Sequence, residues 1–267
     1  MERVLKGVKF SIDDARQGPA FFVLGVRKSG SSMFNRVCRL LAKYNSYNFV
    51  DVAGSMFSNN INVGLWNTDP SLNQLLLPGN VYGGFRNYPL SIAANPLFRD
   101  GKKVLLVRDP RDALVSEYFS NAYSHSVPSE KIAVAGGARQ NILQQRQAAL
   151  STDIDSYVSQ RAELMRATLV DYEPLLDDVN TKLFRYEDII FNKGEMIEQI
   201  ADHFGWSCKH KQVEAILGWV DVIPKVENPQ QFIRKVTPGD HREKLSAMTL
   251  RHLDQVLRDV LATFGYH

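Results

Sequence analysis

The regular alternation of short apolar runs with helical patterns constrains this chain most. Residues 21–26, Phe-Phe-Val-Leu-Gly-Val, predict a buried strand, and the segment that follows carries apolar residues at the 3, 4, 7 spacing of a helix. Four more strands are predicted at 48–52, 80–85, 104–107 and 182–186. Further helices are predicted at 111–121, 157–176, 195–204 and 211–220, with a last helix that ends at Gly265. The alternation predicts one α/β domain over residues 1–267, with a central, largely parallel sheet flanked by helices.

The composition is that of a soluble globular protein, with 44% hydrophobic and 23% charged residues. A net charge of only +3 argues against a protein that coats nucleic acid. The two cysteines, Cys38 and Cys208, are too few for a disulfide-stapled secreted fold. No apolar run reaches the length of a membrane helix, and the first residues lack the apolar core of a signal peptide. We therefore expect a cytoplasmic protein without nucleic-acid or membrane partners.

One segment, 124–150, departs from this pattern. It contains a Gly-Gly pair and several glutamines. Such a composition predicts a mobile loop or an insertion within the domain, not a domain boundary.

A candidate phosphate loop follows the first strand directly, in the sequence Gly25-Val-Arg-Lys28-Ser29-Gly30-Ser31-Ser32. Small residues between a strand and a helix let backbone N–H groups approach an anion, and the helix N-terminus adds partial positive charge. The spacing of Gly25 and Gly30 fits a Walker A loop, but that motif has lysine directly after its second glycine, where this chain has Ser31. The alternative is a polar turn whose serines only cap the helix.

A second candidate phosphate site begins at the end of the strand at 104–107. Arg108 stands where open α/β sheets place their ligand crevice, and Ser116 lies two turns into the next helix. An arginine fork and a serine hydroxyl suit one phosphate group. The alternative is a surface ion pair between Arg108 and Asp112, worth less than about 1 kcal/mol.

Two later segments complete a set of four, Phe184-Arg-Tyr186-Glu187-Asp188 and Phe232-Ile-Arg234-Lys235-Val236-Thr-Pro-Gly239-Asp240-His241. In order along the chain, the four resemble motifs of the sulfotransferases that use the sulfate donor PAPS. These motifs are the Lys-Ser-Gly-Thr-Thr loop, the 3′-phosphate strand–helix, the Tyr-Glu-Asp segment and the Arg-Lys-Gly-x-x-Gly-Asp-Trp stretch. The resemblance spans residues 23–241 and implies a P-loop-like α/β fold. It also implies transfer of a sulfuryl group from PAPS to a hydroxyl or amine, with adenosine 3′,5′-bisphosphate (PAP) released.

The resemblance implies a role for each matching residue. Lys28 would lie by the oxygen that bridges phosphate and sulfate, and would stabilise the charge that builds there as the bond breaks. The 5′-phosphosulfate would be held by Lys28, Ser29, Gly30, Ser31 and Ser32. The 3′-phosphate would be held by Arg108, Ser116, Arg234 and Lys235. Tyr186 and Met33 would lie near the adenine. No metal is required in this scheme, and the spacing of His203, Cys208 and His210 matches no standard zinc site.

Several family positions are occupied differently in this chain. Met33 replaces the usual tryptophan after the loop, and a thioether covers adenine less specifically than an indole. Val236 replaces a glycine and His241 replaces the tryptophan of Gly-Asp-Trp. The loop around Val236 is therefore expected to follow a different backbone course.

The general base is the largest departure. Many cytosolic members carry a catalytic histidine in a Lys-Thr-His segment, whereas the matching stretch 83–87 is Gly-Gly-Phe-Arg-Asn. Arg86 cannot accept a proton, and would instead contact the sulfuryl group or an acidic acceptor. Other branches use a carboxylate near the end of the second strand, where this chain has Asp51. We predict Asp51 as the base and His125 as the second candidate, the alternative being that Asp51 only caps a turn or pairs with a cation.

We expect the acceptor to be a small molecule or a glycan. The irregular segments 53–88 and 124–150 are expected to line its side of the site, and they offer both aromatic and asparagine side chains. Two rival functions stay open at this point. One is a P-loop nucleotide kinase, and the other is a non-catalytic PAPS- or PAP-binding module that has lost its base.

Overall fold

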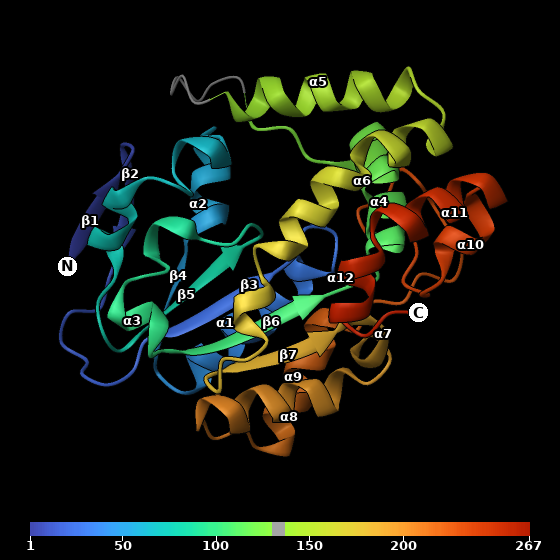
Figure 1. Cartoon of the computed structure of the whole chain (residues 1–267). Coiled ribbons are helices and arrows are strands. Elements are labelled where there is room, and N and C mark those ends of the chain that lie inside the picture. Colours follow the sequence, from blue (N-terminus) through green and yellow to red (C-terminus); the bar gives the residue numbers. More distant parts are fainter. Residues whose placement is uncertain (130–136) are drawn as a thin grey trace.

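Five parallel strands form the central sheet in the computed structural model, which describes residues 1–129 and 137–267. Their order across the sheet is β4–β5–β3–β6–β7 (Figure 1). The strands are β3 (Phe21–Gly25), β4 (Asn48–Asp51), β5 (Asn80–Phe85), β6 (Lys102–Val107) and β7 (Thr181–Arg185). The predicted α/β architecture with a parallel sheet is therefore confirmed, and each strand lies within two residues of its predicted limits.

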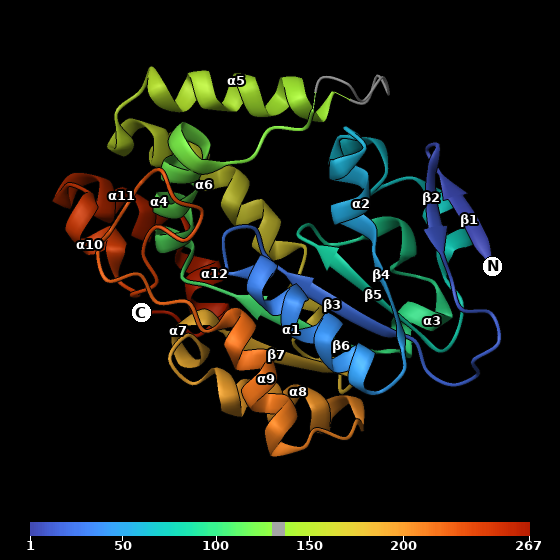
Figure 2. The ribbon, with the colours of Figure 1, turned by 180° about the vertical axis from the view of Figure 1, so that it is seen from behind.

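Helices cover both faces of the sheet, and this explains the unbroken apolar run of β3. Phe21 and Val23 belong to the core on one face, and Phe22 and Leu24 belong to the core on the other. The first face is covered by α1 (Ser31–Tyr44), α8 (Lys193–Phe204) and α9 (His210–Val220), which lie in front of the sheet in Figure 2. The second face is covered by α4 (Pro110–Phe119), α6 (Ile154–Val170), α11 (Ala247–Val256) and α12 (Arg258–Thr263).

Shorter elements surround this framework. An N-terminal antiparallel hairpin consists of β1 (Glu2–Leu5) and β2 (Val8–Ser11). The remaining α-helices are α2 (Val52–Ser58), α3 (Pro96–Arg99), α5 (Ala138–Leu150), α7 (Tyr186–Ile189) and α10 (Asp240–Lys244). The 3₁₀ turns are η1 (Val63–Leu65), η2 (Pro70–Leu75), η3 (Leu90–Ile92) and η5 (Glu173–Leu175), and η4 (Ser120–Ser124) is a π-helical turn. Among the described residues, no helix has the length and apolar character needed to cross a membrane.

The segment expected to be a mobile loop or insertion is helical over half of its length. Residues 138–150 form α5, because alanine, arginine, glutamine and leucine are strong helix formers and outweigh the preceding glycines. The loop expectation was wrong for these residues, and residues 130–136 lie outside the described part. The last predicted helix is interrupted at Leu257 and forms α11 and α12. The helix predicted at 157–176 ends earlier, and Pro174 lies in the 3₁₀ turn that follows.

The strand order places the two candidate phosphate sites side by side. The chain moves from β3 to one side of the sheet through β4 and β5, and β6 then pairs with β3 on the other side. In open α/β sheets the ligand crevice lies at this switch point, outside the carboxyl ends of the strands. The backbone N–H of Val26 donates to the carbonyl of Leu106 at 2.9 Å, so the loop after β3 begins directly beside the end of β6.

Candidate active site

The loop between β3 and α1 forms a cradle with an open helix terminus. Lys28 and Gly30 have φ values of 64° and 88°, a left-handed backbone that turns the chain sharply before the helix. The Ser29 hydroxyl is buried and donates to the Val26 carbonyl at 2.6 Å, so it stabilises the loop itself. No side chain caps α1, whose first residues Ser31 and Ser32 are half-buried. This is the arrangement in which backbone N–H groups bind an anion.

Gly30 lies where the loop packs closely against Tyr186. A Cβ atom at this position would lie 3.0 Å from the ring of Tyr186, the first residue of α7. Met33 packs on the same apolar cluster that contains Tyr186 and Val236. The cradle, the adenine-side candidates and the C-terminal segment are therefore in one place.

Arg108 occupies the carboxyl end of β6 and is 6% exposed. Its guanidinium carbon lies 4.4 Å from the centroid of the Tyr186 ring, and its Nη2 lies 3.3 Å from Oδ2 of Asp112. The ion pair weighed in the sequence does form, but it is buried and not on the surface. The Nε atom of Arg108 is buried and has no hydrogen-bond partner among the described residues. A buried donor without a partner costs about 1–3 kcal/mol, and a bound anion is one acceptor that would offset this cost.

The C-terminal segment reaches the same helix through Asp112 of α4. The backbone N–H groups of Gly239 and His241 donate to this carboxylate at 2.7 and 2.9 Å, and His241 Nδ1 lies 2.7 Å from it. Burial opposes its ionisation, but the His241 hydrogen bond and the Arg108 charge outweigh burial and lower the pKa of Asp112. The imidazole thus makes a polar contact where the family has tryptophan.

Arg234 and Lys235 face the same helix but are paired with carboxylates. Arg234 stacks over the ring of Phe119 at 4.1 Å, one turn beyond the half-buried Ser116 on α4, and it pairs with Glu227 and Asp240. Lys235 Nζ lies 3.0 Å from Asp240. The four residues predicted around the 3′-phosphate therefore come from two segments that pack together at α4.

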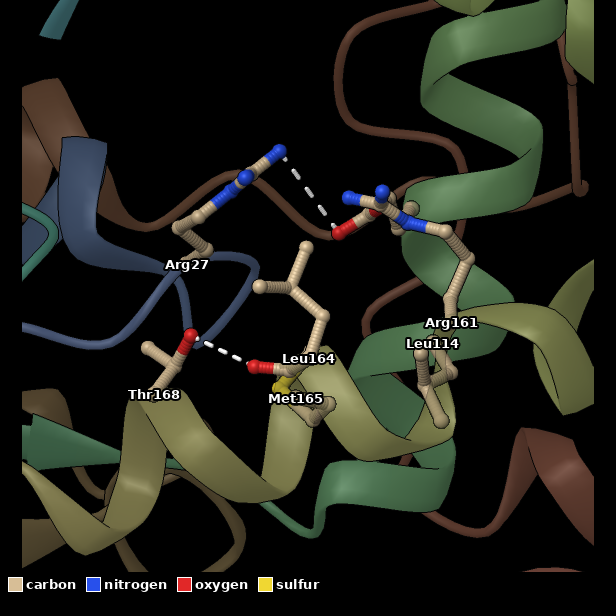
Figure 3. Close-up of a pocket in the computed structure, with 7 residues that line it drawn as sticks. Arg27, Leu114, Arg161, Leu164, Met165 and Thr168 are labelled. Carbon is tan, nitrogen blue, oxygen red and sulfur yellow. Dashed lines mark hydrogen bonds and ion pairs between the residues drawn. The ribbon is translucent and has the colours of Figure 1, made fainter. Parts of the chain in front are cut away.

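A buried carboxylate that the sequence analysis did not identify lies behind the cradle. Glu117 on α4 is 2% exposed and accepts from Arg161 Nε at 2.8 Å and from the Tyr157 hydroxyl at 3.2 Å. Arg27 Nη2 lies 3.7 Å from it, and Figure 3 shows Arg27 and Arg161 converging from two sides. The one available signal was an acidic residue inside the apolar stretch of the helix that follows Arg108.

The pKa of Lys28 depends on its burial and on charged side chains from several of these elements. Burial of the ammonium group lowers the pKa of Lys28 to about 8, although the residue keeps some access to solvent. Glu117 raises this pKa, whereas the cations Arg27, Arg86 and Arg108 lower it. Lys28 therefore loses its proton near physiological pH much more readily than an ordinary lysine.

Asp51 stands at the carboxyl end of β4 and is the N-cap of α2. Its Oδ1 accepts from the backbone N–H of Gly54 at 3.0 Å, and its Oδ2 pairs with Arg39. A Cβ atom on Gly84 of β5 would lie 2.5 Å from Oδ1. The glycine in the stretch that lacks the family histidine therefore leaves room for the Asp51 carboxylate, although both predicted alternatives, a cap and a cation pair, are also realised.

His125 is held at the end of the π-helical turn η4. Its backbone N–H donates to the Ser120 carbonyl at 2.7 Å, and its ring packs on Phe57 of α2 at a centroid distance of 5.7 Å. Nδ1 lies 2.9 Å from the Ser126 carbonyl, which can only accept, so Nδ1 carries the proton and Nε2 has the free lone pair. Burial lowers the pKa of His125, and nearby Lys28 lowers it further.

The described residues contain no group of three histidine, cysteine or acidic side chains that could hold a metal ion. His203 Nε2 lies within hydrogen-bond distance of the carbonyls of Lys103 and Asn180. His210 is largely exposed beside Glu214.

Comparisons with known proteins give the family and the fold. A family model described as sulfotransferase domain matches residues 19–265. Among solved structures, mouse sulfotransferase SULT7A1 complexed with PAP superposes with a TM-score of 0.61 at 15% identity, covering 97% of this chain and 95% of that one. Retinol dehydratase in complex with androsterone and inactive cofactor PAP superposes with a TM-score of 0.52 at 15% identity, covering 92% and 81%. The complex of retinol dehydratase with retinol and PAP gives 0.51 at 17% identity, covering 92% and 82%. No curated protein sequence matches this chain significantly.

Proposed function

The chain belongs to the sulfotransferase family, and we propose that it moves a sulfuryl group from PAPS to a hydroxyl or amine of a small-molecule or glycan acceptor. The observation that carries this proposal is the buried Nε of Arg108 near the cradle after β3, which has no hydrogen-bond partner in the described part of the chain. A phosphate oxygen would satisfy this hydrogen-bond donor. The PAP complexes of SULT7A1 and retinol dehydratase support the same choice of ligand.

Residues at the cradle and at α4 are the candidates for binding the sulfate donor. We assign the 5′-phosphosulfate to Lys28 and to the N–H groups and hydroxyls at the start of α1, and the 3′-phosphate to Arg108, Ser116, Arg234 and Lys235. The Ser29 hydroxyl already bonds within the loop, so its contribution to the donor is the backbone shape. Tyr186 and Met33 are assigned to the adenine. Cationic groups at both ends of the donor make a metal ion unnecessary in this scheme.

The proposed chemistry is an in-line displacement at sulfur. The acceptor oxygen or nitrogen forms a bond to sulfur while the bond from sulfur to the bridging oxygen breaks. The electron pair of that bond stays on the 5′-phosphate of PAP, where Lys28 stabilises the charge. The acceptor proton passes to Asp51, or to Nε2 of His125 if Asp51 is not the base. The products are the sulfated acceptor and PAP.

Binding of PAP is the direct test of the donor site. We expect PAP without added metal to stabilise the protein by about 2.7 kcal/mol when present at about 100 times its Kd, which raises Tm by several degrees. Incubation with PAPS and a broad acceptor panel should then add one SO₃ unit to an acceptor, measured by mass spectrometry. Stabilisation by ATP with Mg²⁺ but not by PAP would identify a nucleotide kinase. Stabilisation by PAP with no acceptor modified would identify a non-catalytic binding module.

The two candidate bases can be separated by isosteric substitutions. Asp51→Asn retains an oxygen that can cap α2, and we expect it to lower kcat by a factor of about 10²–10⁴ without weakening PAP binding. His125→Gln is expected to change kcat by less than about threefold, because proton transfer remains with Asp51. Turnover should be measured across a pH range with both variants. The reverse pattern assigns the base to His125, and full activity in both variants excludes both residues.

Both cysteines are free thiols, and Cys38 is buried in the core. A protein with unpaired cysteines suits a reducing compartment, and we propose the cytoplasm as its location.

A further inference from the structure

The charges around the cradle do not balance. Besides the Arg108–Asp112 ion pair, five cationic side chains gather there, and among the described residues two further carboxylates face them. The cations are Arg27, Lys28, Arg39, Arg86 and Arg161, and the carboxylates are Asp51 and Glu117. Arg27 and Arg161 share Glu117, and Arg39 pairs with Asp51. Within the described part of the chain, Lys28 and Arg86 have no carboxylate within 4.0 Å.

A bound sulfate donor would supply the counter-charge for Lys28, which is one of these two cations. This step rests on the proposed function, in which the phosphosulfate group lies against Lys28. A 5′-phosphosulfate carries two negative charges at neutral pH, and with Asp51 and Glu117 it leaves one of the five cations without a counter-charge. Arg86 is the candidate, because each of the other three cations lies within 4.0 Å of Asp51 or Glu117 and Lys28 faces the donor.

Arg86 lies beside the cradle. It directly follows β5, the residue is exposed, and its Nη2 donates to the hydroxyl of Ser32 at 3.1 Å. The ring of His125 packs on Phe57 of α2, and His125 lies within electrostatic range of Arg86 and Lys28. The Arg86 guanidinium and the His125 ring are therefore both near Lys28.

We propose that the acceptor carries an anionic oxygen group, a carboxylate or its equivalent, beside the group that is sulfated, and that Arg86 binds it. A guanidinium presents parallel N–H donors that match a carboxylate better than a neutral hydroxyl or amide. Phe57 suits an apolar or aromatic body next to the anion. Arg86 thereby selects the acceptor, and the selection is a property of this chain's own stretch at 83–87.

Matched acceptors that differ only in charge test this assignment. The probes are 4-hydroxyphenylacetate with 4-hydroxyphenylacetamide, and glucuronate with glucuronamide. Sulfate transfer from PAPS and binding to the PAP-loaded protein by calorimetry are both measured. We expect the wild-type protein to prefer the carboxylate member about tenfold in kcat/KM or in affinity, and Arg86→Gln to reduce that preference to about one. Arg251→Gln, which removes the same charge from the exposed face of α11, should keep the wild-type preference.

Three results would overturn the assignment. The first is the absence of a carboxylate preference in both pairs and both readouts. The second is a preference that survives Arg86→Gln. The third is an Arg86→Gln variant that loses affinity for PAPS but not for PAP, which would place Arg86 on the sulfuryl group of the donor. Failure of the proposed function is distinct, because it appears as a wild-type protein that does not bind PAP at all.

Discussion

Replacing Lys28 by methionine is expected to lower kcat for sulfate transfer by a factor of about 10²–10³, the usual effect of removing one group that stabilises developing charge. Methionine keeps most of the apolar stem and removes the ammonium group. The loss should fall on kcat, because negative charge grows on the bridging oxygen only as its bond to sulfur breaks. Affinity for PAP should fall less than about tenfold, since the loop N–H groups remain.

Lys43→Met is the matched control. Lys43 lies in the last turn of the same helix, α1, and is exposed. We expect this variant to retain wild-type kcat and PAP affinity. A Lys28→Met variant with near-normal kcat would remove Lys28 from the chemistry, while a proportional loss of PAP affinity and turnover would make it a binding residue only.

The lowered pKa of Lys28 gives this role a pH signature. Because the protonated form is the active one, kcat/KM for PAPS should fall as the pH rises through about 8. Burial is the main cause of this low pKa; Glu117 favours the protonated form, and Arg27, Arg86 and Arg108 oppose it. The anionic donor favours the ammonium form once bound, so the alkaline limb of kcat should lie at a higher pH than that of kcat/KM. The limb should be absent in Lys28→Met.

The sheet and the closeness of the two candidate phosphate sites could be predicted from the sequence, because each rests on a local pattern. A strand buried on both faces reads as an unbroken apolar run, and β3 and β6 are such runs. Parallel strands bring their carboxyl ends to one edge of the sheet. A parallel sheet therefore predicts that Lys28 and Arg108 lie at the same edge.

Features that depend on distant contacts could not be predicted in the same way. Glu117 is part of the site only because Arg27 and Arg161 reach it from the loop after β3 and from α6. The N-terminal hairpin turns at Lys6-Gly7, where both φ values are positive, and this pair is a weaker turn signal than Asn-Gly. His125 was expected in a mobile segment, but the π-helical turn and Arg146, which donates to its carbonyl at 2.6 Å, fix it in place.

Arg108→Gln is expected to remove most of the selectivity for a 3′-phosphate. In the wild-type protein PAP should bind at least about 100 times more tightly than adenosine 5′-monophosphate, because a buried, hydrogen-bonded charge contact contributes about 2–5 kcal/mol. In the variant the ratio should fall at least about tenfold, and the part that remains is assigned to Ser116, Arg234 and Lys235. Calorimetry with the two nucleotides gives the ratio directly, and the shared adenosine and 5′-phosphate cancel in it.

The fold should tolerate this substitution, since Asp112 keeps the N–H groups of Gly239 and His241 and the imidazole of His241 when Arg108 is lost. Arg185→Gln is the control, because Arg185 ends the adjacent strand β7 and pairs with Asp188 instead of facing the nucleotide site. It should leave the ratio of the two affinities unchanged. If Arg108→Gln keeps the wild-type ratio, the buried Nε has another purpose and the 3′-phosphate site must lie elsewhere. If both variants lose it equally, the effect comes from the sheet edge as a whole and not from one guanidinium.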